Sequence, residues 1–149
     1  MPHEWHRGDY TISTDPTRLD IDLIYDFLSN RSYWAQGRTL DTIRTSIQNS
    51  LPFGLYLHGD NEENLEQQIG FCRVVTDYAT FAWLADVFIL PDHRGRKLGE
   101  WLIETVLSHP DLQTLGRWVL ATRDAHTLYA KFGFQPLENP DRFMMRRLR

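Results

Sequence analysis

The sequence predicts a single mixed α/β domain over residues 1–149, in which helices cover a central β-sheet. Its length of 149 residues fits one compact domain with a buried core. Short apolar runs of strand type alternate with segments in which apolar residues recur at the helical period. Hydrophobic residues make up 42% of the sequence, so a largely disordered chain is excluded.

Four segments are expected to be helices because their apolar residues recur every three to four positions and so share one helical face. These segments are residues 21–28, 39–48, 96–107 and 125–132. In the last of them, Asp124 is placed to cap the first turn, and Gly133 is placed to end the helix.

The other apolar runs are of strand type. Strands are expected at residues 53–59, at two places within 69–90 joined by a turn near 77–80, and at 117–123. The polar residues 59–68 predict a hairpin loop between the first two of these strands. Residues 134–137 and 142–147 are expected to close the sheet, giving the order β-α-α-β-β-β-α-β-α-β-β.

Composition narrows the class of protein. The formal net charge of −4 argues against bulk attraction to nucleic acid or to an anionic membrane. The single cysteine, Cys72, excludes a disulfide within the chain and fits the reducing cytoplasm. Neither a secretion signal nor a membrane-spanning run is recognised in the sequence. His3 and His6 offer two imidazoles without a third ligand, so no metal site is expected.

Residues 91–99, PDHRGRKLG, place basic side chains around two glycines directly before a helix. Pro91 ends the preceding strand because it has no N–H to donate, and Gly95 lets the chain turn. The first N–H groups of a helix lack internal partners and lie at the positive end of its dipole, where a phosphate fits. Neither the dinucleotide fingerprint G-x-G-x-x-G nor the Walker pattern is present. From these residues alone, an anion site and an ordinary turn with solvated basic residues both remain open.

Two blocks resemble the GNAT superfamily of acyl-coenzyme A N-acyltransferases. The run from Leu84 to Leu107 is similar to its cofactor signature, an apolar strand, a proline and then [Q/R]-x-x-G-x-[G/A] opening a helix. Arg94 takes the first place and Gly99 the last, while Lys97 replaces the middle glycine. The run DAHTLYAKFGF, residues 124–134, is similar to the later family segment A-x-x-L-Y-x-K-x-G-F.

The resemblance implies a central, mostly antiparallel sheet flanked by helices, with a splayed pair of parallel strands at the cofactor site. In that arrangement residues 86–90 separate from 117–123 because a bulge interrupts pairing. Acetyl-coenzyme A is the implied co-substrate, without a metal. Its implied binding residues are Val87, Phe88 and Ile89 for the pantetheine arm, and Arg94, Gly95, Arg96, Lys97, Leu98 and Gly99 for the pyrophosphate. Because Lys97 carries a Cβ, the bend there is expected not to depend on the conformational freedom of glycine.

The resemblance also suggests catalytic residues. Tyr129 matches the tyrosine that protonates the departing thiolate in the family, although core packing is the alternative reading. Asp86 is the only acid in its apolar strand, and it is a base, a binder of the cationic substrate or a partner of a neighbouring arginine. Tyr33, Trp34 and Trp83 form either an aromatic wall around the acceptor amine or packing between helix and sheet.

The expected activity is therefore acetyl transfer from acetyl-coenzyme A to a primary amine by direct attack on the thioester. The acceptor is a small molecule or a peptide, and the sequence does not say which. A coenzyme A-binding sensor or interaction module on the same fold is the alternative. A nucleic-acid-binding reading of HRGRK is disfavoured by the net charge. The resemblance leaves a homodimer through C-terminal strand edges possible.

Overall fold

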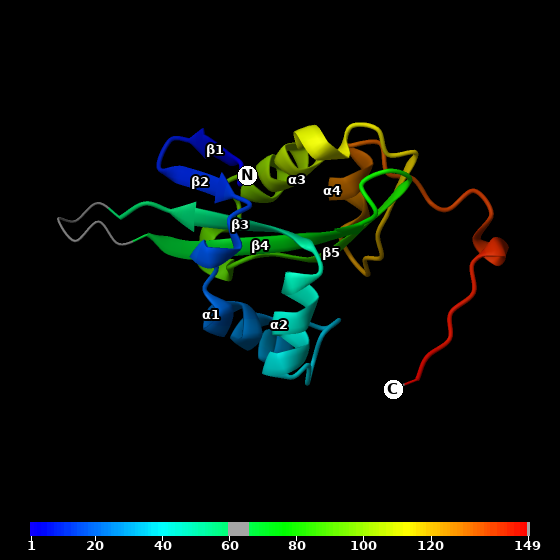
Figure 1. The fold of residues 1–149 in the computed structure, drawn as a ribbon, viewed down its shortest axis with the longest axis horizontal. Coiled ribbons are helices and arrows are strands. Elements are labelled where there is room, and N and C mark those ends of the chain that lie inside the picture. The colour runs from blue at the N-terminus through cyan, green and yellow to red at the C-terminus, as the bar shows by residue number, and fades with distance from the viewer. Residues whose placement is uncertain (60–65, 149) are drawn as a thin grey trace.

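The computed structural model describes residues 1–59 and 66–148. Its principal elements are β1 (Glu4–Arg7), β2 (Tyr10–Ser13), α1 (Ile21–Asp26), α2 (Leu40–Gln48), β3 (Leu51–Leu57), β4 (Gln67–Thr76), β5 (Phe81–Ile89), α3 (Leu98–Leu107), β6 (Arg117–Val119) and α4 (His126–Ala130). Helices α1 and α2 cover one face of the sheet, while α3 and α4 cover the other (Figure 1). The predicted mixed α/β class is confirmed.

One sheet of six strands runs in the order β1-β2-β3-β4-β5-β6. All neighbouring strands are antiparallel except β5 and β6, which are parallel. Pairing between these two extends only from Phe81 opposite Arg117 to Trp83 opposite Val119, although β5 continues to Ile89. The two strands therefore separate, and the implied splayed parallel pair is confirmed.

A β-bulge lies in β5 on its border with β4. Arg73 is paired with Ala85 and Phe71 with Phe88, so Asp86 and Val87 together lie opposite a single residue. Asp86 has φ 57°, in the left-handed region that few residues other than glycine adopt. The resemblance placed a bulge on the β6 side, whereas in the structure it interrupts the register with β4.

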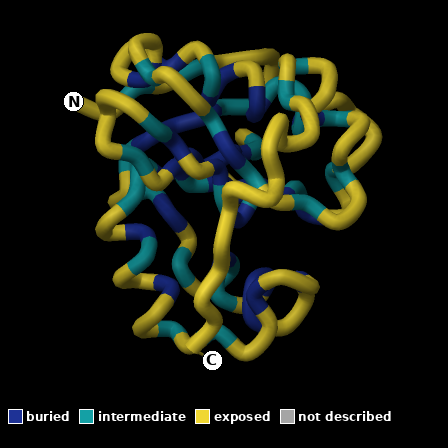
Figure 2. Tube along the Cα trace, turned by 90° about the vertical axis from the view of Figure 1, so that its right-hand side faces the viewer, coloured by how far each residue is buried: buried dark blue, intermediate teal, exposed yellow. Residues whose placement is uncertain are grey.

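The buried residues lie along the middle of β3, β4 and β5 and on the inner faces of the helices (Figure 2). The helix predicted at 21–28 begins as expected, with Asp20 accepting a hydrogen bond from the Leu23 N–H at 3.1 Å. After Asp26 it widens into a π-helical turn, Phe27–Arg31, which places the Phe27 ring on Phe88 with a centroid distance of 4.1 Å. This turn brings the end of the first helix against β5.

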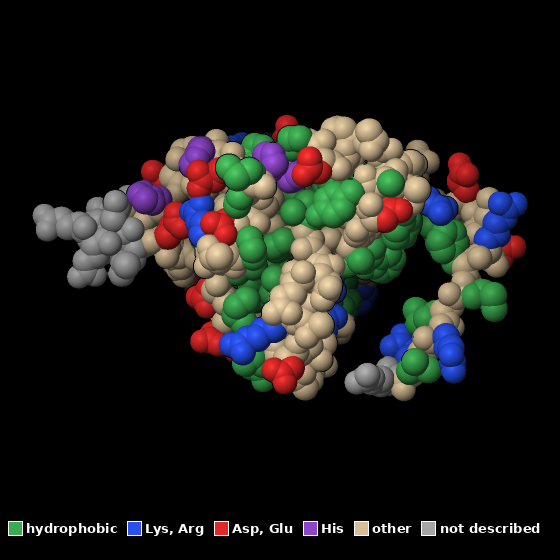
Figure 3. All heavy atoms as spheres, viewed as in Figure 1, with side chains coloured by type: hydrophobic (Ala, Val, Ile, Leu, Met, Phe, Trp, Pro, Cys, Tyr) green, Lys and Arg blue, Asp and Glu red, His purple; other side chains and the backbone are tan. Residues whose placement is uncertain are grey.

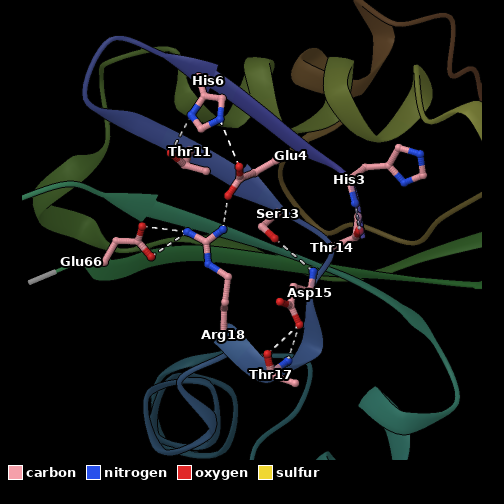
Figure 4. Close-up of polar contacts among 10 residues, drawn as sticks. All are labelled: His3, Glu4, His6, Thr11, Ser13, Thr14, Asp15, Thr17, Arg18 and Glu66. Atoms are coloured by element: carbon pink, nitrogen blue, oxygen red, sulfur yellow. Dashed lines mark hydrogen bonds and ion pairs between the residues drawn. The ribbon is translucent and has the colours of Figure 1, made fainter. Parts of the chain in front are cut away.

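The chain begins with a hairpin, β1 and β2, beside β3. Arg18 ties this hairpin to the rest of the sheet, because its guanidinium pairs with Glu4 on β1 and with Glu66 at 2.7 Å just before β4 (Figure 4). His6 turns toward Glu4 and Thr11, whereas the His3 ring packs against that of His109 at a centroid distance of 4.6 Å. The two N-terminal imidazoles therefore lie in different environments.

The prediction for the C-terminal strands is wrong. Residues 134–137 and 142–147 form no strand, and residues 135–148 are all exposed. Pro136 and Pro140 have no N–H to donate to a ladder, and Pro140 begins a short 3-10 turn. The segment leaves the body beside α4 and extends away from it (Figure 1), with its apolar and basic side chains apart from the rest of the surface (Figure 3).

The predicted helix cap at Asp124 is also wrong. The last helix begins after Ala125, whose N–H donates to the Thr122 hydroxyl at 3.1 Å, and the cap residue makes no side-chain bond. Gly133 does follow the helix, with φ 90°.

Within the described residues, the structure contains no helix long and apolar enough to span a membrane.

Candidate functional site

Two adjacent cavities, of about 530 and 510 Å³, form a continuous cleft where β5 and β6 separate. One half contains the turn before α3, and the other contains Asp86 and the residues that follow β6. The residues that line both halves are Tyr33, Trp34, Val87, Asp124, Ala125 and Tyr129. A ligand with two chemically different ends would fit such a cleft, and the point at which the two ends of the ligand join would lie beside Tyr129.

The half beside α3 collects the residues that the resemblance assigns to coenzyme A, with one exception. It is lined by Val87, Phe88, Ile89, Arg94, Gly95, Lys97, Leu98 and Gly99. Arg96 instead turns its guanidinium toward β2, where Nη1 donates to the Tyr10 hydroxyl at 2.8 Å. Arg94 lies at the cavity with its Nε held on the Ile89 carbonyl at 3.1 Å.

The turn before α3 carries several backbone amides that have no acceptor among the described residues, and Gly95, Lys97, Leu98 and Gly99 of this turn line the cavity. The N–H groups of His93 and Arg94 are used in the 3-10 turn that starts at Pro91. From residue 95 to residue 99, no backbone N–H donates to an acceptor in the described parts of the chain. These groups lie at the positive end of the α3 dipole, which is the arrangement that binds phosphate.

Lys97 occupies a conformation that glycine favours. It has φ 59° and ψ 23°, and it immediately precedes the first residue of α3. The expectation that its Cβ would impose an ordinary bend is therefore wrong. The left-handed conformation of a non-glycine residue costs about 1–2 kcal/mol of conformational free energy. The turn nevertheless forms with lysine at this position, and the ammonium group of Lys97 is therefore present in the loop.

Tyr129 lies at the junction of the two halves, on α4. Its side chain is buried, and its ring meets Phe134 edge-on at a centroid distance of 5.8 Å. Burial raises the pKa of the Tyr129 phenol above its ordinary value near 10, so the group is protonated at neutral pH. The same effect raises the pKa of the fully buried Cys72 thiol, which is therefore not a nucleophile at neutral pH.

In the other half, Asp86 is held by three side chains. Its Oδ2 accepts from Arg38 Nη1 at 2.9 Å and from Arg73 Nε at 2.7 Å, and its Oδ1 accepts from Trp34 Nε1 at 2.9 Å. The carboxylate is only 3% exposed. Of the three roles open to Asp86 from the sequence, the structure shows the pairing with neighbouring arginines.

The predicted aromatic residues Tyr33, Trp34 and Trp83 all line this half and are all more than one third exposed. Tyr33 meets Trp34 edge-on at 5.0 Å, and the Arg123 guanidinium carbon lies 3.8 Å from the centroid of the Tyr33 ring. The Tyr33 hydroxyl also accepts from the Arg123 N–H at 2.8 Å. Tyr33 thus joins the segment after α1 to the segment after β6 across the cleft.

Arg38, Arg73 and Asp124 also line the cleft but were not predicted to be site residues from the sequence. Arg73 had a usable signal, since it is an isolated charge within an apolar strand, as Asp86 is in the next one. Arg38 and Asp124 lie in polar segments that resemble any surface loop. Within residues 1–59 and 66–148, no group of three or more metal-ligating side chains is present.

Known proteins that are similar to this chain are acetyltransferases. The family model described as an acetyltransferase (GNAT) domain matches residues 57–136. A curated protein of Gibberella zeae, assigned as an acetyltransferase, is 36% identical over 146 residues, covering 87% of this chain and 81% of that protein.

Solved structures show the same relationship. A GNAT-family protein from Xanthomonas campestris is 45% identical with a TM-score of 0.86, and 93% of each chain is covered. An acetyltransferase from Clostridium acetobutylicum, crystallised with acetyl-CoA, shares the fold with a TM-score of 0.66 at 13% identity, covering 99% of this chain and 96% of that chain. The match of the family model over more than half of the sequence, together with the identity to the Gibberella protein, shows that this chain belongs to the GNAT family of acetyltransferases.

Proposed function

We propose that the protein transfers the acetyl group of acetyl-coenzyme A to a primary amine by direct attack of the amine on the thioester. The observation that carries the proposal is the row of amides at residues 95–99, which have no acceptor among the described residues and lie at one end of a cleft that runs past Tyr129 to Asp86. Phosphate suits one end of this cleft, and a polar acceptor suits the other.

The residues present fit coenzyme A. The amides of residues 95–99 would hold its pyrophosphate, and the Lys97 ammonium would add a charge-assisted contact. Beyond Trp83 the β6-facing edge of β5 has no strand partner among the described residues, so backbone groups of Val87 and Ile89 are candidates to bind the pantetheine arm. The bound thioester supplies an activated acetyl group beside Tyr129.

In the proposed reaction, the amine nitrogen forms a bond to the acetyl carbon, and the bond from that carbon to sulfur breaks. The Tyr129 hydroxyl would donate its proton to the departing thiolate. The proton released by the amine would return to the Tyr129 oxygen, directly or through water, so that Tyr129 is again a phenol at the end of the cycle. Because burial keeps Cys72 as a thiol, no acyl-enzyme step is invoked. Since each Asp86 oxygen is already bonded to cationic or N–H donors, we assign Asp86 to positioning and not to proton abstraction.

The test is to measure coenzyme A affinity by calorimetry, and thiol release from acetyl-coenzyme A with a panel of small amines and peptide amines. Gly99→Asp places a carboxylate among the loop amides, where it would repel a pyrophosphate. A Cβ at Gly99 has room, with its nearest neighbour 3.9 Å away, and an acidic residue in the first turn favours the helix.

We expect Gly99→Asp to weaken coenzyme A binding by at least about tenfold, and Gly99→Ala to leave it nearly unchanged. Equal affinity in all three proteins would show that the loop does not hold the pyrophosphate. Tight binding without thiol release for any amine would favour the alternative of a coenzyme A-binding module.

A further inference from the structure

The acceptor half of the cleft contains more positive than negative charge at its buried end. Arg38 and Arg73 share the single carboxylate of Asp86, and each guanidinium group carries a positive charge. Asp86 is 3% exposed, Arg73 14% and Arg38 25%, so solvent screens this cluster only partly. One unit of positive charge is therefore left unbalanced among these three residues.

Each of the two arginines also has guanidinium N–H groups that make no hydrogen bond among the described residues. Arg38 uses Nη1 on Asp86, while its Nε and Nη2 have no acceptor among the described residues. Arg73 uses Nε on Asp86 and Nη1 on the Ser50 hydroxyl at 3.0 Å, which leaves Nη2. Both residues line the cavity, so a ligand there would lie beside their guanidinium groups.

The remaining charges at this half do not cancel the excess. Arg123 and Asp124 also line it, but they form a pair of their own at 3.8 Å and are both 66% exposed. A half-buried guanidinium that lacks part of its hydrogen bonds and its counter-charge is costly, and an anion would supply both. Guanidinium groups bind carboxylate and phosphate oxygens particularly well.

We propose that the acceptor amine carries an anionic group, a carboxylate or a phosphate, which Arg38 and Arg73 bind. This inference rests on the proposed acetyl transfer and specifies its substrate class. It disfavours polyamines and simple alkylamines, which bring only positive charge to this end of the cleft. It also disfavours a cation cage built on Tyr33, because Arg123 already covers a face of that ring.

The experiment compares matched acceptors that differ only in the anionic group. Amino acids are assayed beside their carboxamides, and O-phosphoethanolamine beside ethanolamine, with thiol release as the readout. We expect the preferred anionic member to have a kcat/KM at least about tenfold above that of its neutral analogue. The carboxylate and phosphate pairs show which of the two anions the site takes.

Variants of Arg38 identify the residue responsible. Arg38→Gln should raise the KM of the anionic acceptor by about tenfold or more, with the KM of acetyl-coenzyme A unchanged, and Arg38→Lys should restore part of the loss. Arg44→Gln is the matched control, because Arg44 is an exposed arginine that lines neither half of the cleft. Thermal unfolding of each variant verifies that it is folded.

The outcomes separate the two proposals. Turnover of neutral amines as fast as of their anionic analogues, or an Arg38→Gln variant with an unchanged acceptor KM, would overturn the anionic acceptor while leaving acetyl transfer intact. Coenzyme A binding without turnover of any acceptor, anionic or neutral, would overturn both.

Discussion

Arg73 and Asp86 lie on neighbouring strands and form a partly buried ion pair, with Arg73 Nε 2.7 Å from Asp86 Oδ2. The bulge in β5 creates this arrangement, because Arg73 is in register with Ala85 and Asp86 follows as one of two residues opposite Cys72. A feature of the backbone thus places the only acid of β5 at the acceptor end of the cleft.

Asp86→Asn is expected to lower the free energy of unfolding by about 3 kcal/mol, because it leaves two partly buried guanidinium groups without their counter-charge. If Asp86 only positions Arg38 and Arg73, the acid limb of the pH profile of kcat persists in the variant. Loss of that limb would instead identify Asp86 as the base. Asp124→Asn is the matched control for stability, since that carboxylate is 66% exposed.

Tyr129→Phe is expected to lower kcat by about a hundredfold or more while coenzyme A affinity stays nearly constant, because only the proton donor is removed. Tyr56→Phe is the control, since Tyr56 is also buried but lies on β3 and lines neither half of the cleft. Unchanged turnover in Tyr129→Phe would remove the general-acid assignment.

The phenols of Tyr56 and Tyr129 also make the free energy of unfolding depend on pH in the alkaline range. Burial raises the pKa of both Tyr56 and Tyr129 above the value near 10 that they have in the unfolded chain. Their contribution to the free energy of unfolding is therefore full below about pH 10 and is lost as the pH rises beyond it. Chemical denaturation between pH 8 and about pH 11 should show a decline that is shallower in each Phe variant.

The helices and central strands were predictable because the periods of their apolar residues directly reflect which faces are buried. The turn before α3 was also predictable, since glycine and proline mark it. The pairing of Asp86 with Arg38 and Arg73 was not, because it depends on a bulge and on residues distant in sequence. The two expected C-terminal strands failed because their apolar residues suggest burial that the structure does not provide.

Lys97→Gly is expected to raise the free energy of unfolding by about 0.5–1 kcal/mol. Glycine relieves the left-handed strain at φ 59°, although it gains more freedom in the unfolded chain. The same change should weaken coenzyme A binding because the ammonium is lost. Lys97→Ala separates the two effects, since it loses the charge but keeps the Cβ and hence the strain. A Gly variant that is less stable than the Ala variant would show that this turn is not strained in solution, because only the greater freedom of glycine in the unfolded chain would then separate them.

Removal of residues 136–149 is expected to change the free energy of unfolding by no more than about 0.5 kcal/mol, because residues 136–148 are all exposed. Phe134, which packs on Tyr129, is retained in this truncated chain. The measurements are chemical denaturation and light scattering of dilute full-length and truncated protein. The tail exposes Phe143, Met144, Met145 and Leu148, so its loss should also reduce aggregation at high concentration. A loss of more than about 2 kcal/mol in the free energy of unfolding, or conversion of a dimer into a monomer, would contradict this expectation. Either result would show that the tail packs against protein surface, and the edge of β6 is the first candidate for that contact.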